Sequence, residues 1–109
     1  MKYLTMKQIQ EESFKTAKEH GFHEKFNVSE KLCLIHSEIS EALEDYRSDL
    51  MRTYKSSPDD KPCGFPTELA DAVIRIADLA EYLGINLSEE IQQKMEYNKS
   101  RPYKHGRKC

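Results

Sequence analysis

The segment ELADAVIRIADLAEYLG, residues 68–84, constrains the fold more than any other part of the chain. Most of its residues are apolar and favour a helix. Charged residues nevertheless recur in it at spacings of three, four and three, namely Glu68, Asp71, Arg75 and Asp78. At about 100° per residue, these side chains fall within roughly 80° of one another on a helix. The segment therefore predicts a helix with one narrow polar stripe and an apolar surface around most of the remaining circumference.

Helical signals also run through the rest of the chain. Apolar periodicity predicts helices at about residues 5–19, 27–51, 68–84 and 86–98. Capping signals precede three of them, in the pairs Thr5 and Gln8, Asn27 and Glu30, and Asn86 and Glu89. The loop SSPDDKPCGFP is dense in helix breakers, and no strand pattern competes. We expect a single all-α domain over residues 1–109, built as a four-helix bundle.

Composition narrows the class of protein. The chain has 109 residues, a net charge of −2 and 38% hydrophobic residues, which suits one domain with a thin core. Its N-terminus lacks the apolar run of a signal peptide, and no segment approaches the roughly 18 apolar residues of a membrane span. Three cysteines spread along the chain fit neither a disulfide framework nor a zinc site. The expected protein is soluble and cytoplasmic, with no membrane partner.

Two pairs of carboxylates indicate that part of the polar stripe could bind a cation. Glu38 and Glu41 are three residues apart, so their side chains leave adjacent turns of one helix face. If the two apolar faces pack together, this pair approaches Glu68 and Asp71 of the stripe. Four converging carboxylates repel one another unless protons or a cation neutralise them. Ligands that are all oxygen favour a hard cation, so the sequence predicts a site for Mg²⁺, with Mn²⁺ as a substitute.

The order of these motifs resembles that of the MazG-like all-α nucleoside triphosphate pyrophosphohydrolases. The matching residues are Glu38-Ile-Ser-Glu41 and Glu68-Leu-Ala-Asp71, followed by the tail segment KMEYNKSRPYKHG. The resemblance covers roughly residues 29–106. The family motif often carries a further glutamate where this chain has Ser37, which leaves four acidic ligands here and not five.

The resemblance implies hydrolysis of a (deoxy)nucleoside triphosphate between the α and β phosphates, giving a monophosphate and pyrophosphate. It implies that Glu38, Glu41, Glu68 and Asp71 hold the magnesium ion, and that Glu41 or Glu38 orients the attacking water. Spacing alone does not choose among the four carboxylates. The tail is similar to a phosphate-binding segment, in which the candidates for substrate contact are Lys94, Asn98, Arg101 and His105.

Other interpretations compete with this one. Arg75 and Asp78 are expected to form an ion pair along the stripe rather than to contact substrate. His20 and His23 flank a predicted turn, where a metal pair is not expected. Together with Phe22 and Phe26 they could line a nucleobase pocket, although core packing is the favoured use of the phenylalanines.

Two further function classes stay open. A carboxylate-bridged di-iron bundle would require Glu-x-x-His motifs, which neither carboxylate pair supplies. A non-enzymatic helical module could bind nucleic acid or a protein through the basic C-terminal segment, although nucleic acid is not the expected partner. Such binding would survive loss of the four carboxylates and would depend steeply on salt.

The wide apolar arc of the third predicted helix also bears on assembly. Ala70 and Ile74 lie away from Ala72, so the helix must be covered from several directions. The first predicted helix is too polar to cover much of it. We expect a homodimer or homotetramer in which helices from different chains complete the bundle.

Overall fold

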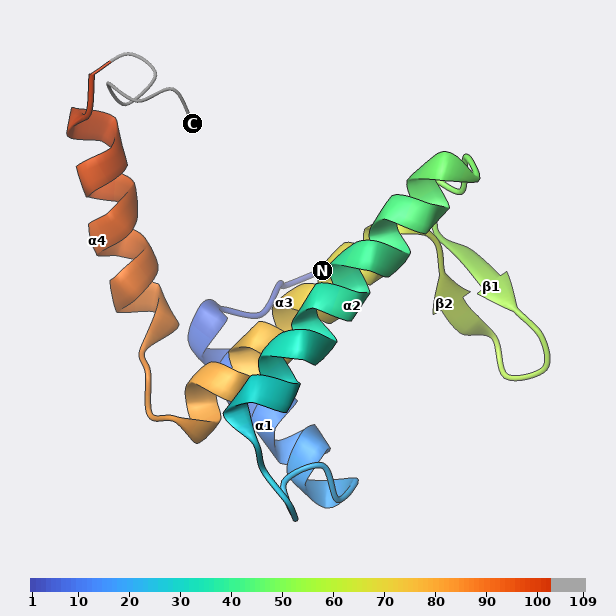
Figure 1. Cartoon of the computed structure of the whole chain (residues 1–109), viewed down its shortest axis with the longest axis horizontal. Coiled ribbons are helices and arrows are strands. Elements are labelled where there is room, and N and C mark those ends of the chain that lie inside the picture. The colour runs from blue at the N-terminus through green and yellow to red at the C-terminus, as the bar shows by residue number, and fades with distance from the viewer. Residues whose placement is uncertain (103–109) are drawn as a thin grey trace.

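The computed structural model of the chain is described for residues 1–102 and is predominantly helical (Figure 1). Within these residues it contains four helices and one antiparallel hairpin. In chain order they are α1 (Met6–Glu19), α2 (Val28–Arg47), β1 (Tyr54–Ser56), β2 (Lys61–Cys63), α3 (Phe65–Tyr82) and α4 (Leu87–Ser100). The predominantly helical class is confirmed, whereas the expectation of no strand was wrong. No helix in this part of the chain is both long and apolar enough to cross a membrane.

Helices α1, α2 and α4 begin at the capping signals in the sequence. Thr5 and Gln8 form a reciprocal capping box at the start of α1. The side chains of Asn27 and Asn86 accept hydrogen bonds from backbone N–H groups at the starts of α2 and α4. These bonds satisfy donors that the first helical turn leaves free.

The largest departure from the predicted boundaries lies between α2 and α3. Helix α2 ends at Arg47 instead of continuing to about Met51, and Asp49 adopts a left-handed backbone conformation with φ of 60°. Strands β1 and β2 then pair antiparallel, with Tyr54 opposite Cys63 and Ser56 opposite Lys61. The intervening turn, residues 57–60, contains the proline and aspartates that the breaker pattern had marked as loop.

Gly64 joins the hairpin to α3, and its φ of 110° is open to glycine but not to most other residues. A side chain here would also collide with the carbonyl group of Arg52. Pro66 follows in the first turn of α3, where its missing N–H costs nothing. The helix therefore starts at Phe65, slightly before the predicted start at Glu68.

Helix α3 is the centre of the fold, because it packs against α2 along one side and α1 along another. The two flanking helices leave the polar stripe of α3 between them. The residues with the least exposure in this packing are small, and the buried apolar set is Ala42, Ala72, Ala77 and Ala80. Small residues let the helix axes approach closely.

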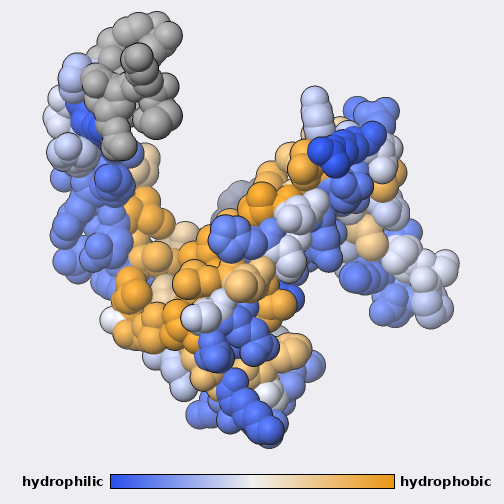
Figure 2. Space-filling view, viewed as in Figure 1, coloured by the Kyte–Doolittle hydropathy of each residue, from blue (hydrophilic) through white to orange (hydrophobic). Residues whose placement is uncertain are grey.

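Much of the larger apolar surface remains exposed in the single chain. It includes Val73 at 45% and Ile74 at 47% of their full exposure, on α3. Figure 2 shows hydrophobic residues gathered over the body of the molecule, in the recess beside α4. Contiguous apolar surface of this kind is unusual on a monomer.

Helix α4 projects away from the α2–α3 pair (Figure 1). Its start is tied to α1 by the buried side chain of Gln10. Gln10 Nε2 donates to the Ile85 carbonyl oxygen at 2.8 Å, and Gln10 Oε1 accepts from the Leu87 N–H at 3.0 Å. The clamp holds the turn between α3 and α4, while the rest of α4 extends from it.

Candidate metal centre

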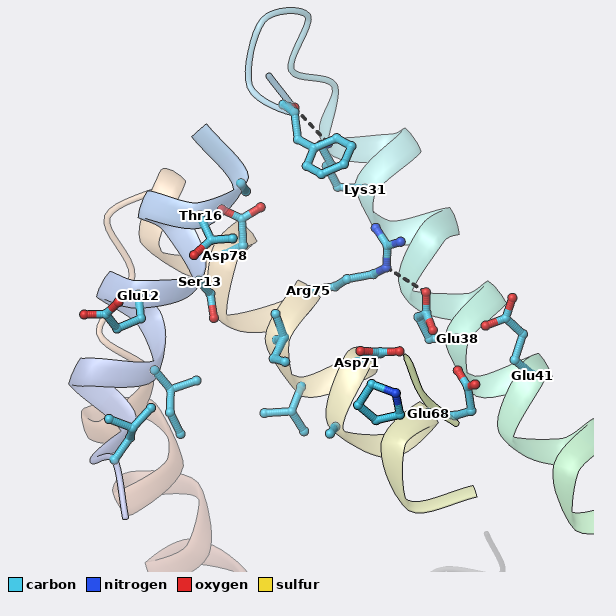
Figure 3. Close-up of a pocket in the computed structure, with 18 of the residues that line it drawn as sticks. Glu12, Ser13, Thr16, Lys31, Glu38, Glu41, Glu68, Asp71, Arg75 and Asp78 are labelled. Atoms are coloured by element: carbon cyan, nitrogen blue, oxygen red, sulfur yellow. Dashed lines mark hydrogen bonds and ion pairs between the residues drawn. The ribbon is translucent and has the colours of Figure 1, made fainter. Parts of the chain in front are cut away.

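Three of the four predicted metal ligands gather at the contact between α2 and α3. Each of Glu38, Glu41 and Glu68 offers one carboxylate oxygen, and these oxygens lie within 4.8 Å of one another. Glu38 and Glu41 reach the centre from adjacent turns of α2, and Glu68 comes from the first turn of α3 (Figure 3). One cation at this point could contact all three side chains.

Asp71 lies beside this group on the next turn of α3 (Figure 3). It lines the same pocket, and burial, followed by the negative charge of Glu38, raises its pKa. The tight set of oxygens nevertheless consists of Glu38, Glu41 and Glu68. The spacing argument therefore placed all four carboxylates in one neighbourhood, with Asp71 outside the closest cluster.

The crowding of acids changes their protonation. Burial, followed by the adjacent Glu41 carboxylate, raises the pKa of Glu68 from 4.5 to about 7. Glu38 and Asp71 act in the same direction. The pKa of Asp71 is also raised, by burial and then by Glu38, while Arg75 and Lys61 oppose the change. Near neutral pH the centre holds a proton that a cation could replace.

Glu38 supplies a second sign that the negative charge of the centre is only partly neutralised. Its side chain is 9% exposed, and its Oε1 accepts a hydrogen bond from Arg75 Nε at 2.9 Å. The other oxygen, Oε2, is buried without a hydrogen-bond partner. A buried carboxylate oxygen is costly to leave unpaired. The all-oxygen donor set and this orphaned atom fit Mg²⁺ or Mn²⁺.

The expected ion pair between Arg75 and Asp78 is wrong. Arg75 pairs with Glu38 of α2, and Asp78 pairs with His23, whose Nε2 lies 2.8 Å from Asp78 Oδ1. The stripe runs along the contacts of α3 with neighbouring elements, although Asp71 and Arg75 remain exposed to solvent. Arg75 and Asp78 therefore each find a partner on another element and do not pair with each other.

A pocket of about 960 Å³ begins at the carboxylates and runs between α1, α2 and α3. The polar stripe of α3, including Asp71 and Arg75, lines it. Lys61 of the hairpin and Lys31 near the start of α2 also face it. The pocket thus joins an acidic end to cationic and polar side chains further along.

The structure does not bring the predicted phosphate-binding residues to this pocket within one chain. Lys94, Asn98 and Arg101 are absent from the residues that line it in the described part of the chain. They belong to α4 and the residue after it, which Figure 1 shows projecting away from α2 and α3. Lys94 and Arg101 instead flank the ring of Tyr97, at 5.2 Å and 5.4 Å from its centroid. The fourth candidate, His105, lies outside the described residues.

Sequence reasoning missed one cation of the site, Lys61, and the partner of a second, Arg75. Lys61 lies inside the segment predicted to be an irregular loop. The sequence therefore offered no reason to expect this side chain near the carboxylates. A turn of Pro58, Asp59 and Asp60 between short extended runs was the signal for the hairpin that positions it. Arg75 was recognised, but its partner was sought along its own helix.

Comparison of the chain with protein-family models, with curated proteins and with solved structures gives no match in any of the three.

The raised pKa of Glu68 predicts how the metal-free protein responds to pH. In the unfolded chain this carboxyl loses its proton near 4.5, whereas the folded state keeps it until about 7. The folded state therefore binds more protons across this window, and stability must fall as pH rises through it. Asp71 contributes with the same sign.

Urea unfolding in the presence of EDTA, at several pH values between 5 and 8, measures this effect. The variant Glu68→Gln cannot titrate at this position and serves as the reference. We expect the wild type to lose stability relative to the variant as pH rises. Parallel stability curves for the two proteins would contradict the assignment. Added Mg²⁺ should offset this loss in the wild type, because the cation takes the place of the proton, and should stabilise Glu68→Gln less.

Proposed function

We propose that the chain hydrolyses nucleoside triphosphates between the α and β phosphates, as a MazG-like pyrophosphohydrolase. One observation carries the proposal: three carboxylates from two helices converge within 4.8 Å at the end of a large pocket. The centre has the oxygen ligands that Mg²⁺ prefers, and its negative charge is not fully neutralised by protein side chains. The pocket has room for a ligand much larger than a phosphate ion.

When bound, Mg²⁺ would offset negative charge on the phosphate oxygens and help to activate a water molecule. Glu38, Glu41 and Glu68 would hold it, with Asp71 close enough to join them. Arg75 fixes Glu38 in place through the 2.9 Å contact from Nε to Oε1. This ion pair keeps the buried carboxylate oriented toward the centre.

Glu41 is the better candidate for orienting the attacking water. It is exposed, whereas Glu38 is buried and already accepts a bond from Arg75. A residue that takes a proton from water needs access to that water. Lys61 faces the same pocket and could contact a phosphate oxygen as a point charge.

The same proposal requires a second copy of the chain. Lys94, Asn98 and Arg101 can grip the outer phosphates only if they come from the α4 helix of another subunit, since their own α4 projects away. A homodimer or homotetramer would also cover the exposed apolar surface of α3. Lys94 and Arg101 carry charge opposite to that of the acidic centre, which supports this pairing.

A panel of ribo- and deoxyribonucleoside triphosphates, incubated with Mg²⁺, tests the activity. The expected products are the monophosphate and pyrophosphate in equal amounts, with no release of orthophosphate. EDTA should stop the reaction. Orthophosphate as the only product would place the cleavage at the γ phosphate and reject the proposal, as would the absence of any hydrolysis.

A non-enzymatic module is the second candidate, and one feature of α4 favours it. Tyr97 is 56% exposed and lies between Lys94 and Arg101, an arrangement that suits stacking and phosphate contact with single-stranded nucleic acid. Binding of this kind should weaken steeply with salt and should not require the carboxylates. The nucleotide panel therefore separates the two candidates.

A further inference from the structure

The pocket has a second end that the metal centre does not use. There Asp78 of α3 lies near the α1 residues Ser13 and Thr16, which line the same pocket (Figure 3). Asp78 follows Asp71 by seven residues on the helix, which corresponds to about 10 Å along its axis. A ligand with its phosphates at the carboxylates would therefore extend its far end toward Asp78.

The Asp78 side chain is held in a fixed position. Its Oδ1 lies 2.8 Å from His23 Nε2, and the exposed fractions of the two side chains are 12% and 9%. An ionised carboxylate can only accept, so the imidazole N–H is the donor. The His23 ring packs against Phe14 and Tyr82, with centroid distances of 4.7 Å and 5.2 Å. The aromatic packing fixes His23, and His23 fixes Asp78.

The second oxygen of Asp78 keeps some exposure, and Asp78 lines the pocket. Among the described residues, the hydrogen bonds of this side chain engage Oδ1 alone. In that same part of the chain, two buried side-chain atoms lack a hydrogen-bond partner, His23 Nδ1 and Glu38 Oε2. Oδ2 of Asp78 is not one of them, so this oxygen is not fully buried. Asp78 lines the pocket, so its second oxygen can serve a ligand there as an acceptor, and it cannot act as a donor while ionised.

A flat apolar surface lies along the same pocket. Phe22 lines it and is 62% exposed. Lys31 Nζ donates to the Phe22 backbone carbonyl oxygen at 3.0 Å and lies 5.8 Å from the centroid of its ring. Phe26, by contrast, stacks on Tyr82 at 3.5 Å between ring centroids. Phe22 is therefore the aromatic side chain available to a ligand here, and exposed aromatic rings stack on nucleobases.

We propose that Asp78 selects substrates by accepting a hydrogen bond from the exocyclic amino group of the nucleobase. This inference rests on the proposed function, since it names the base end of the same pocket. Cytosine and adenine present an amino donor where uracil and hypoxanthine present a carbonyl oxygen. A carbonyl oxygen facing Asp78 would leave two acceptors in contact, which a buried site penalises strongly. Asp78 therefore favours amino-bearing bases.

Two matched substrate pairs test the inference on the unmodified protein. Cytidine triphosphate is compared with uridine triphosphate, and adenosine triphosphate with inosine triphosphate, by kcat/KM in the presence of Mg²⁺. We expect the amino-bearing member to be preferred by about tenfold or more in at least one pair. Equal rates within both pairs, or a preference for the carbonyl member, would overturn the inference and leave the proposed hydrolysis intact.

The variant Asp78→Asn assigns the preference to this residue. Its amide keeps one acceptor for His23 and presents a donor toward the pocket, so the preference should fall to within about threefold. Asp49→Asn is the matched control, because Asp49 is exposed, lies outside this pocket and has the left-handed backbone that asparagine tolerates. An unchanged preference in Asp78→Asn, with a far-UV circular dichroism spectrum like that of the wild type, would contradict the role of Asp78.

Binding measurements separate this inference from the proposed activity. If no triphosphate is hydrolysed, the activity is rejected, but calorimetry with cytidine, uridine, adenosine and inosine monophosphates still tests the base site. Tighter binding of the amino-bearing member, lost in Asp78→Asn, would support the inference without hydrolysis. Equal or undetectable binding of both members of both pairs would overturn it. The wild-type comparisons decide the question even if Asp78→Asn does not fold.

Discussion

Replacing Glu68 by glutamine is expected to lower hydrolysis by about a thousandfold or more without disturbing the helices. Glu68 offers one of the three clustered oxygens, and an amide is a weaker, uncharged ligand. Glu41→Gln should have a similar effect. In both variants, circular dichroism should retain the helical signal, and calorimetric titration with Mg²⁺ should show weakened binding.

The same substitution should make the metal-free protein slightly more stable above pH 7. The wild-type centre then carries several ionised carboxylates that repel one another, and glutamine removes one of these charges. A loss of activity caused by unfolding would give the opposite change in stability. Thermal unfolding in EDTA therefore distinguishes a lost ligand from a damaged fold.

Glu44→Gln is the matched control for these variants. Glu44 lies on the same helix, three residues after Glu41, and pairs with Arg47 at the surface at 3.2 Å. It is outside the pocket, and a surface pair of this kind contributes little to stability. Its activity should equal that of the wild type. Full activity of Glu68→Gln with Mg²⁺ would contradict the assignment of the metal site.

Mixing two impaired variants is expected to raise activity above that of either variant if α4 serves the site of another subunit. Chains with Glu68→Gln lack a working centre but keep α4 intact. Chains with Arg101→Ala keep the centre and lose the phosphate contact, which should cost about 1.5–3 kcal/mol. In a mixed dimer, one of the two sites combines intact carboxylates with an intact α4. Random pairing should recover about a quarter of the wild-type sites.

The outcome of mixing depends on which chain supplies the basic residues. If each α4 served its own site, every site in the mixed dimer would carry one defect, and activity would stay low. Sedimentation equilibrium must first establish the assembly. A mass matching a single 12.8 kDa chain at micromolar concentration would refute the oligomer and with it this arrangement. Unchanged Mg²⁺ affinity in Arg101→Ala is also expected, since Arg101 does not line the centre.

Much of the local structure could be predicted from the sequence. The starts of three helices could be predicted because Thr5, Asn27 and Asn86 cap the helical turns that directly follow them. The carboxylate centre was also readable, since the helical period alone puts Glu38 and Glu41 on one face. The wide apolar surface of residues 68–84 indicated that this helix packs against the helix that carries Glu38 and Glu41.

The tertiary structure alone decided the partners of the polar stripe. The spacing of Arg75 and Asp78 allowed an ion pair, but the choice of Glu38 and His23 depends on how α2 and the segment before it cross α3. The hairpin that brings Lys61 to the pocket depends on contacts between strands that the breaker-rich sequence did not reveal. The direction of α4 depends on the Gln10 clamp to the α3–α4 turn. Periodicity reports which residues share a face of one helix, whereas packing between elements determines what that face meets.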